Sequence, residues 1–412
     1  MITLREQSLL PDKYIDQLDL RDVYTSMPVE QLSLNRGDDG QWWSSYYIGV
    51  AEINGQEIEV LPKLENLDFM SLFSFALLYQ PSSEYFSSCY DINWNQEIIA
   101  STELYNVLTP LLVMQYLSIL EKLVGKGLKR DYVTFDENLH SKIRGKIKPI
   151  DNWRKNILKK KEDYLYCQYQ VFSADIYVNR LLKKALDTSL NLLGNVRSRS
   201  QNLKGLSFLS SKIQLLDAFR GIKSDVRVES VKNYKFDKLN MYYTEAIRLA
   251  KCIIRHQDNS LNDGSGRKKV PLFWIDMARL YEVYVLGLLQ THYPNQILFQ
   301  VKGSYDTQCD YLHIGEGIVI DAKYKLWYSS PQRMRKENKH DLIADIREIS
   351  AYARDERFLS LMKNHNNPPI CIIVYPDKQT TPLDSELSKS VANNKIEGYK
   401  DFYRLGIKLP TL

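Results

Sequence analysis

The sequence is poor in the residues that build the commonest enzyme centres. Its five cysteines are scattered without a Cys-x-x-Cys pair and its six histidines are isolated, which argues against structural zinc and indicates a reducing compartment. It contains no G-x-x-x-x-G-K-[S/T] phosphate loop, no G-x-S-x-G elbow and no H-E-x-x-H pair. These absences argue against nucleotide hydrolysis by this chain alone and against the usual serine-hydrolase and zinc-peptidase sites.

The sequence also has little that points to a membrane. Its first residues do not combine a basic start with an apolar stretch, so no export signal is expected. The most apolar window, residues 104–124, is interrupted by Pro110, Glu121 and Lys122, and is predicted to be a packed amphipathic helix rather than a membrane span. A cytoplasmic protein with no membrane partner is the expectation. A net charge of +5 over 412 residues permits a nucleic-acid partner without predicting one.

Near the C-terminal end, acidic and basic residues follow a pattern typical of a metal-dependent phosphodiesterase site. Asp310 precedes a glycine-rich turn, and the apolar run 318–320 leads into Asp321-Ala-Lys323. Residues two apart on a strand face the same side, so Asp321 and Lys323 are expected to project together, with Asp310 on the partner strand of a hairpin. The two carboxylates, with the Ala322 carbonyl as a further ligand, suit Mg²⁺, and the lysine could orient water or neutralise phosphate charge.

An acid-x-Lys triplet also occurs by chance in a chain with this much charge. Glu337-Asn-Lys339 is one example, in a polar run without strand character. A salt-bridged strand end with no chemistry is therefore an alternative for Asp321 and Lys323. The apolar run before them favours a site, because a solvated pair is unusual at the end of a buried strand.

Two predicted helices carry further candidate residues. Residues 273–289 have apolar side chains at three- and four-residue spacing, and Glu282 within them is costly to bury unless it is paired or metal-linked. An exposed polar-face position is the alternative for this residue. Residues 341–354 predict a second helix that places Asp345 and Glu348 near one face, where they could line a substrate cleft.

Basic residues are concentrated in two places. Residues 332–339 predict a basic loop whose charges could neutralise backbone phosphates near the metal, although a solvated loop is the commoner explanation. Lysines, arginines and aromatic residues also alternate over residues 126–161, a pattern that suits a nucleic-acid strand, a docking surface or a plain solvated face. The candidate DNA-binding residues are Lys325, Arg333, Arg335, Lys336 and Glu348.

The N-terminal half predicts a small β-rich module followed by helices. Strand-like runs at residues 42–50 and 57–61 flank an Asn-Gly turn at residues 54–55, a strong hairpin signal. Helices are expected at residues 67–79, 104–124, 173–193 and 238–256, the third with Ser173 as its N-cap.

The length of the chain suits two buried cores. We expect an N-terminal β-rich and helical domain at residues 1–165 and a C-terminal domain at residues 166–412. The C-terminal domain would comprise a helical part, residues 166–257, and a catalytic core, residues 270–412. The proline-bounded apolar run 369–376 predicts a buried strand, so this core is an α/β or α+β fold with a central mixed sheet flanked by helices.

This order of elements resembles the core of the PD-(D/E)xK nuclease fold. Six further stretches follow a family pattern in the right order: Ile58-Glu-Val-Leu-Pro-Lys63, Gly127–Tyr132, Ile143-Arg-Gly-Lys146, Asn179–Leu186, Asp276-Met277 with Glu282, and Asp310 with Asp321–Lys325. Over nearly its full length, the chain is similar to McrC-type subunits of McrBC restriction systems, which are specific for 5-methylcytosine.

The resemblance implies a Mg²⁺-dependent DNA endonuclease subunit. Asp310, Asp321 and Lys323 match the nuclease triad of the family, and Glu282 matches its helix carboxylate. Two positions depart from the pattern. Cys309 stands where the family favours proline, and Glu348 stands where related helices often have glutamine.

The resemblance also implies a partner and a substrate. McrC-type subunits work with a hexameric McrB-type AAA+ GTPase, which binds the GTP and brings the complex to methylated double-stranded DNA. The N-terminal half would dock into that ring and stimulate GTP hydrolysis, with Lys63, Arg130 and Arg144 as candidate docking residues. Two alternatives stay open: a non-catalytic adaptor that keeps the nuclease fold as a scaffold, and an RNA nuclease of the same fold.

Overall fold

The chain folds into two compact units, each of which is described by itself. The computed structural model describes residues 1–21, 34–37, 40–76, 85, 88–197, 214–227, 242–262, 267–362 and 368–411. The first unit comprises Met1–Leu111, Arg199–Leu206 and Asp263–Leu412, and the second comprises Leu112–Ser198 and Ser207–Asn262. This division differs from the expected boundary between residues 165 and 166, because the N-terminal and C-terminal segments fold together.

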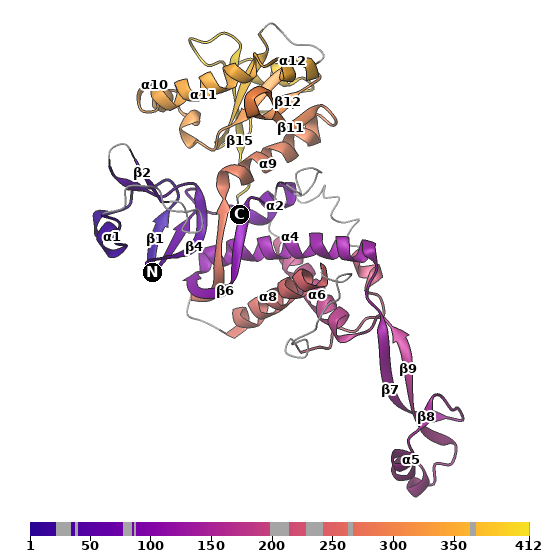
Figure 1. The fold of residues 1–412 in the computed structure, drawn as a ribbon. Coiled ribbons are helices and arrows are strands. Elements are labelled where there is room, and N and C mark those ends of the chain that lie inside the picture. The colour runs from indigo at the N-terminus through magenta and orange to yellow at the C-terminus, as the bar shows by residue number, and fades with distance from the viewer. Residues whose placement is uncertain are drawn as a thin grey trace. The chain divides into compact units, whose positions relative to one another are not determined.

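A five-stranded sheet joins these two segments of the first unit (Figure 1). Its order is β1 (Ile2–Arg5), β5 (Gln56–Leu61), β4 (Tyr47–Ile53), β10 (Arg267–Asp276) and β6 (Tyr90–Ser101). The predicted hairpin turn between β4 and β5 is confirmed, with positive φ at both Asn54 and Gly55. β10 pairs antiparallel with both β4 and β6, so a strand from the C-terminal half completes the N-terminal sheet. The smaller elements here are α1 (Asp12–Gln17), β2 (Asn35–Arg36), β3 (Trp42–Trp43) and α2 (Phe69–Ala76).

The helix predicted from residue 273 begins later than expected. Phe273 to Asp276 are strand residues of β10, and α9 runs over Met277–His292. The Asp276 carboxylate caps this helix by accepting hydrogen bonds from the backbone N–H groups of Ala278 and Arg279, at 3.0 Å each. The apolar spacing before the cap fits a buried strand as well as a helix, which explains the error. The helical position of Glu282 is confirmed.

A second, mixed sheet forms the centre of the C-terminal segment. Its order is β11 (Ile297–Lys302), β12 (Gln308–His313), β13 (Ile318–Ala322), β14 (Ile370–Asp377) and β15 (Phe402–Lys408). The first three strands are antiparallel, whereas β14 and β15 run parallel to β13. The β12–β13 hairpin and the buried β14 strand agree with the sequence predictions.

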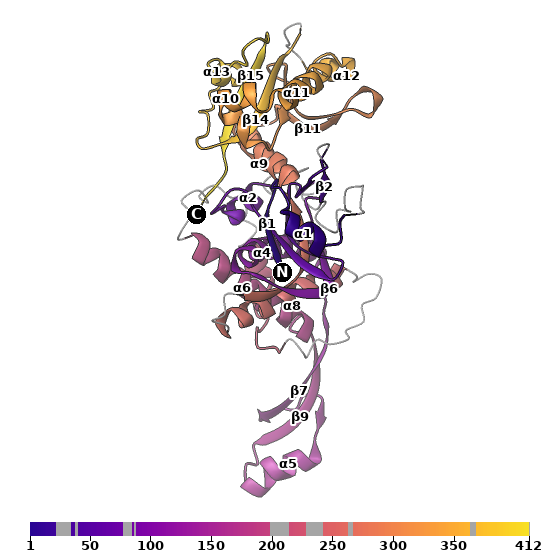
Figure 2. The same cartoon turned by 90° about the vertical axis from the view of Figure 1, so that its left-hand side faces the viewer.

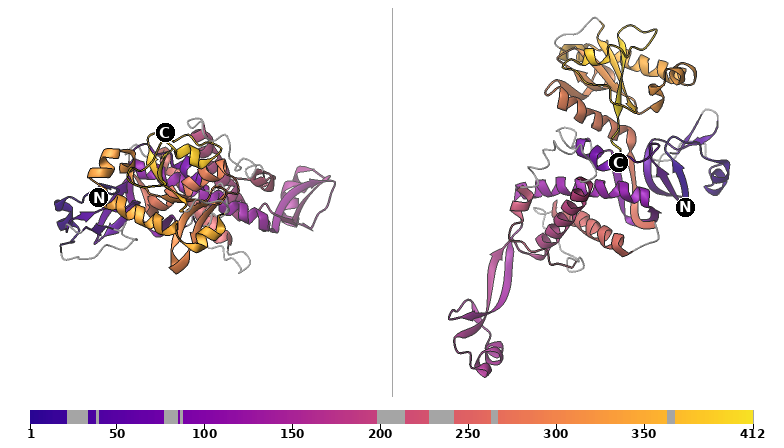
Figure 3. Two further views of the ribbon diagram at one scale, coloured as in Figure 1. Left: turned by 90° about the horizontal axis from the view of Figure 1, so that it is seen from above. Right: turned by 180° about the vertical axis from the view of Figure 1, so that it is seen from behind.

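Helices cover both faces of this sheet (Figure 3). On one face, Ile346 and Ile349 of α11 (Lys339–Tyr352) pack in a core with Leu312 and Val319. On the other, the Tyr311 hydroxyl donates to the backbone carbonyl of Glu282 in α9 at 2.6 Å. The remaining helices are η6 (Ser304–Asp306), η7 (Leu326–Ser329), α10 (Pro331–Lys336), α12 (Glu356–Leu361) and α13 (Leu387–Val391).

The segment predicted as a basic loop is mostly helical. Residues 331–336 form α10, which begins with Pro331 and is capped by the Ser330 hydroxyl accepting from the Arg333 N–H. Proline in the first turn after a serine cap is a helix-start signal. The prediction of a loop rested on the basic residues of this segment and did not use that signal.

Three long helices form the core of the second unit: α4 (Thr102–Lys126), which belongs to this unit from Leu112 onward, α6 (Tyr177–Arg197) and α8 (Tyr242–Asn262). The Tyr116 hydroxyl of α4 donates to the carbonyl of Leu182 in α6 at 2.6 Å. The segment Val107–Lys126 of α4 is long enough and apolar enough to cross a membrane, but 56% of its most apolar window is buried within the protein, as in the core helix of a folded domain. The predicted helix start at Ser173 is wrong, because Ser173 ends strand β9 and α6 begins at Tyr177.

A β-hairpin leaves the helices of the second unit and ends in a small helical cap, which we call the arm (residues 131–173). β7 (Asp131–His140) and β9 (Tyr164–Ser173) pair over ten residues, and β8 (Lys146–Ile147) adds to β9. The tip, residues 141–163, carries α5 (Pro149–Lys155) and η2 (Ile157–Lys159). Figures 1 and 2 show the strands running from the helices to α5.

Candidate active site

The structure brings the predicted catalytic residues together. Asp310 lies on β12, Asp321 lies near the end of β13, and Lys323 follows directly. The pairing of Tyr311 with Ile320 sets the register, and the Asp310 Oδ2 atom accepts a hydrogen bond from the Ala322 N–H at 2.8 Å. The hairpin therefore holds the two aspartates side by side, as the sequence predicts.

Lys323 links the strand to α11. Its Nζ atom lies 2.8 Å from Asp321 Oδ2 and 2.7 Å from Glu348 Oε2, and the Tyr352 hydroxyl donates to Glu348 Oε1 at 2.9 Å. Burial alone would lower the pKa of Lys323, but the two carboxylates raise it above its ordinary value. The ammonium group therefore stays charged at neutral pH.

The acidic side chains of the site repel one another. Burial, followed by repulsion from Glu282, raises the pKa of Asp310 to about 7. Burial also raises the pKa of Glu282 to about 7, with Asp276 and Asp321 adding to the effect. The pKa of Asp321 lies well above its ordinary value because of burial and the nearby Asp310 carboxylate. When all three acids are ionised, they carry more negative charge than Lys323 balances, which is why protonation is favoured.

Two further side chains hold Glu282 and were not predicted. The Gln300 Nε2 atom on β11 donates to Glu282 Oε2 at 2.9 Å and to Asp310 Oδ1 at 3.3 Å. The Tyr85 hydroxyl also donates to Glu282 Oε2, at 2.9 Å. Neither residue belongs to a pattern that stands out in the sequence, so only the folded structure shows their proximity.

The side chains fit a hard divalent cation. Asp321 Oδ2 is buried, and the Lys323 ammonium lies 2.8 Å from it. Carboxylate oxygens are the protein ligands that Mg²⁺ prefers, and a cation would offset the repulsion between Asp310 and Asp321. Over the described residues, no three His, Cys, Asp or Glu side chains form a complete metal site. Asp310 and Asp321 would therefore need the Ala322 carbonyl, water or a phosphate oxygen to complete the coordination.

Comparison with known proteins identifies the family. Residues 44–357 match the family described as McrBC 5-methylcytosine restriction system component, which is more than half of the chain. The chain belongs to this family. A search of curated proteins finds no match.

Two solved structures of the family resemble the chain at low identity. McrC bound to McrB AAA+ hexamers from Thermococcus gammatolerans is 15% identical, with a TM-score of 0.39, and the match covers 100% of this chain and 95% of that chain. The McrBC complex of the same organism is 17% identical, with a TM-score of 0.30 and coverage of 71% of this chain and 87% of that chain.

The expected DNA-binding residues of this McrBC component lie in different surroundings. The Lys325 Nζ atom is 2.8 Å from both carboxylate oxygens of the buried Asp345. Arg333 and Lys336 are exposed on α10, and the Arg335 side chain lies outside the described part of the structure. Glu348, the remaining candidate, is brought to Lys323 as described above. Lys325 is thus engaged within the fold, whereas α10 presents its charges to solvent.

The three candidate docking residues also differ in their surroundings. Lys63 Nζ donates to the Tyr324 carbonyl at 3.0 Å and lies 3.5 Å from the centre of the Tyr324 ring, so its contacts are internal to the first unit. Arg130 is exposed at the base of the arm. Arg144, near the tip, lies 4.2 Å from the centre of the Tyr169 ring. Gly145 beside it is required, because a Cβ atom there would lie 2.3 Å from the Gln168 carbonyl oxygen.

The arm tip exposes six large apolar side chains. The exposed side chains are Ile143, Ile147, Ile150, Trp153, Ile157 and Leu158. Beneath them, the Asn156 amide donates to the side-chain oxygens of Asn138 and Asn152, each at 2.7 Å. Grouped exposed apolar side chains mark protein-binding surfaces, and here a buried polar network holds the group in place. Of the three interpretations of this basic and aromatic segment, a docking surface fits best.

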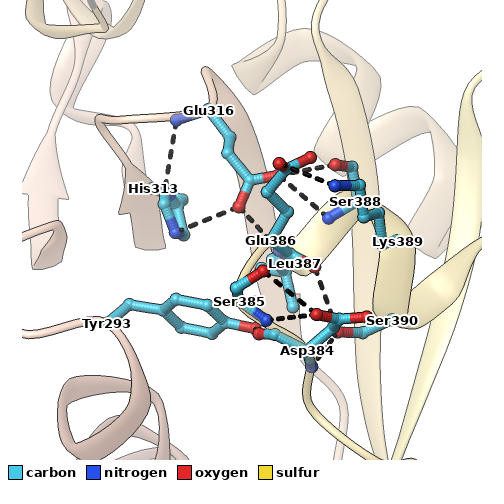
Figure 4. A network of polar contacts seen from close by, with 10 residues as sticks. All are labelled: Tyr293, His313, Glu316, Asp384, Ser385, Glu386, Leu387, Ser388, Lys389 and Ser390. Carbon is cyan, nitrogen blue, oxygen red and sulfur yellow. Dashed lines mark hydrogen bonds and ion pairs between the residues drawn. The ribbon is translucent and has the colours of Figure 1, made fainter.

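A second polar network lies at the turn of the β12–β13 hairpin (Figure 4). The Glu316 carboxylate accepts hydrogen bonds from the backbone N–H groups of Leu387 and Ser388 and from the Ser388 hydroxyl. His313 Nε2 lies 3.5 Å from Glu316 Oε1. Burial lowers the pKa of His313, despite the nearby carboxylate. This network fixes α13 to the hairpin and involves none of the candidate catalytic residues.

Proposed function

We propose that this chain is the DNA endonuclease subunit of a modification-dependent restriction system, with a PD-(D/E)xK nuclease domain that uses Mg²⁺. The observation that carries the proposal is the convergence of Asp310, Asp321 and Lys323 on the neighbouring inner strands β12 and β13 of the mixed sheet. Family membership supports the restriction role, since residues 44–357 match an McrBC system component.

Each residue has a role that follows from its surroundings. Asp310 and Asp321 would hold Mg²⁺, which when bound stabilises charge on the scissile phosphate and lowers the pKa of its water. Glu282 would tune the site from α9 through its repulsion of the Asp310 carboxylate. Because the Lys323 ammonium stays protonated, it would donate hydrogen bonds to the attacking water or to a phosphate oxygen. It would not act as a general base.

The proposed partner is a hexameric McrB-type AAA+ GTPase. The relative from Thermococcus gammatolerans is McrC bound to McrB AAA+ hexamers, and the exposed apolar tip of the arm supplies a surface that suits a protein partner. The partner would bind GTP and bring methylated double-stranded DNA to the nuclease site, and this chain would stimulate its GTP hydrolysis.

The proposal is tested by reconstitution with the cognate motor. Plasmid carrying 5-methylcytosine should be cut only when both GTP and Mg²⁺ are present. Lys323→Ala should abolish cleavage and leave stimulation of GTP hydrolysis intact, because Lys323 lies in the nuclease site. Loss of both activities would contradict the separation of docking from chemistry.

A non-catalytic adaptor is the second candidate, and one observation favours it. Lys323 is paired with both Asp321 and Glu348, an arrangement that could be purely structural. If the complete complex cuts neither DNA nor RNA with GTP and Mg²⁺, the adaptor is correct. Cleavage of RNA but not DNA in a side-by-side assay would identify an RNA nuclease of the same fold.

A further inference from the structure

Gln300 has a backbone conformation that is unusual for its residue type. Its φ is 49°, in the left-handed region that side chains with a Cβ atom disfavour. The strand register would place Gln300 opposite Asp310, yet pairing passes from Phe299 and Tyr311 directly to Val301 and Cys309. The distortion of β11 is therefore local to the position that faces a candidate metal ligand.

The distortion coincides with a bridge between two carboxylates. The single Nε2 atom of Gln300 donates to Glu282 on α9 at 2.9 Å and to Asp310 on β12 at 3.3 Å. The two acids come from different elements and repel each other. Neighbouring rings support this stretch of β11, since the Phe299 ring centre lies 5.1 Å from that of Tyr85 and 5.6 Å from that of Tyr311.

The chemistry of an amide suits this position better than that of a charged group. A lysine here would offset part of the charge of the two carboxylates and compete with a cation, and a glutamate would add to the repulsion. An amide donates hydrogen bonds without changing the charge, so the carboxylates are held close while their negative charge stays available. Strained backbone positions persist where the surrounding structure imposes them, and they are common at functional sites.

We propose that Gln300 is a positioning residue whose strained backbone aims its amide at Glu282 and Asp310, holding both carboxylates ready for one divalent cation. The inference rests on the proposed function only in taking that cation to be the Mg²⁺ of the nuclease. Partners that orient metal ligands in this way typically contribute about tenfold to a hundredfold to metal affinity.

Two variants of the full-length chain separate positioning from packing. Gln300→Met keeps the length of the side chain and the strained backbone but removes the amide. Gln300→Gly removes the amide and relieves the strain, because glycine adopts positive φ readily. Asn295→Gly is the matched control, since Asn295 has a φ of 61° and an exposed side chain in a turn outside the site.

The measurements are melting temperature in chelator and titration with Mn²⁺ followed by electron paramagnetic resonance. Both Gln300 variants should bind Mn²⁺ about tenfold more weakly than the original chain, and Gln300→Gly should melt no lower than the original chain. Asn295→Gly should leave Mn²⁺ binding unchanged. Unchanged or tighter binding in both Gln300 variants would overturn the inference, because the amide would then be a competitor of the cation or a packing group.

Failure of the nuclease proposal is distinguishable from failure of this inference. If the Gln300 variants bind Mn²⁺ about tenfold more weakly than the original chain, but no nucleic acid is cut, the positioning role stands and the nuclease does not. If the original chain cuts DNA and the Gln300 variants cut it with the same Mg²⁺ dependence, the nuclease stands and the positioning role is wrong.

Discussion

The candidate active site and the arm tip differ in which side chains they bury and which they expose. The site buries charge, with Asp321 only 3% exposed, whereas the tip exposes apolar groups, with Ile150 69% and Trp153 54% exposed. Each placement costs stability, since buried charge loses hydration and exposed apolar groups order water. The two proposals rest on this difference: a bound cation would offset the buried acidic charge, and a protein partner would cover the exposed apolar side chains.

The two regions also differ in what holds them together. At the site, charged groups from α9, β12, β13 and α11 act on one another directly. At the tip, neutral asparagines form the buried network, and the exposed apolar side chains contribute little to it. Changes at the site should therefore alter chemistry and stability together, whereas changes at the exposed tip should alter binding alone.

Asp321→Asn should have the largest effect, because it removes a buried charge from the centre of the site. Cleavage by the complex should fall about a thousandfold or more, equivalent to about 4 kcal/mol. Stimulation of GTP hydrolysis should persist. Asp341→Asn, at an exposed position in the first turn of α11, is the control and should cut normally. Equal loss in both variants would mean that the effect is not specific to the site.

Trp153→Ser should have the next largest effect, because it removes an exposed aromatic side chain from the arm tip. A buried aromatic anchor of an interface contributes about 2 kcal/mol or more, so the affinity for the motor should fall about thirtyfold, as measured by titration of GTPase stimulation. The melting temperature of the chain should be unchanged, because the side chain is exposed in the free protein. Phe172→Ser is the control, since Phe172 is also exposed on the arm but lies outside the tip. Similar losses in both would place the contact along the whole arm.

The stability of the metal-free chain should depend on pH because of Asp310 and Glu282. Both have a pKa raised to about 7, whereas unfolded carboxyl groups titrate near about pH 4. Between these values the folded state binds more protons than the unfolded state, so stability decreases as pH rises through about 7. The melting temperature in chelator should fall between about pH 5 and pH 8. Asp310→Asn should flatten the curve, and a curve that rises with pH would contradict the assignment.

Glu316→Gln should have the smallest effect on cleavage, so it shows how much a loss of stability alone changes the cleavage rate. The amide would retain one acceptor but present N–H groups to the N–H donors of α13, at a cost of about 1–2 kcal/mol in the free energy of unfolding. At a temperature well below melting, cleavage should stay within about twofold of the original chain, because Glu316 lies outside the candidate active site and no change in the reaction barrier is expected. A large loss of cleavage would connect the hairpin turn to the site.

Features set by neighbouring residues were predictable from the sequence. The β12–β13 hairpin, the Asn54-Gly55 turn and the helical position of Glu282 all depend on short-range patterns. The sequence prediction is wrong about the start of α9, because strand and helix fit the same apolar spacing, and about residues 331–336, where the Ser330 cap followed by Pro331 starts a helix.

Features that depend on contacts distant in the sequence were not predictable. Gln300 and Tyr85 reach Glu282 only after the chain has folded, and Tyr85 lies 197 residues from it. The internal contact of Lys63 with Tyr324 spans 261 residues. A single sequence does not show which distant residues lie close together in space. The bound cation, the DNA substrate and the cytoplasmic location stay predictions.

β10 limits how this protein can be divided. The strand pairs with β4 and β6 of the N-terminal sheet, and it runs without a break into α9, which carries Glu282. A fragment that ends before residue 267 would leave β4 and β6 without the strand that pairs with both, and one that begins at residue 166 would keep β10 without its partners. The C-terminal half therefore does not form a separate folding unit, and a fragment that keeps its β10 paired must also include the first hundred residues.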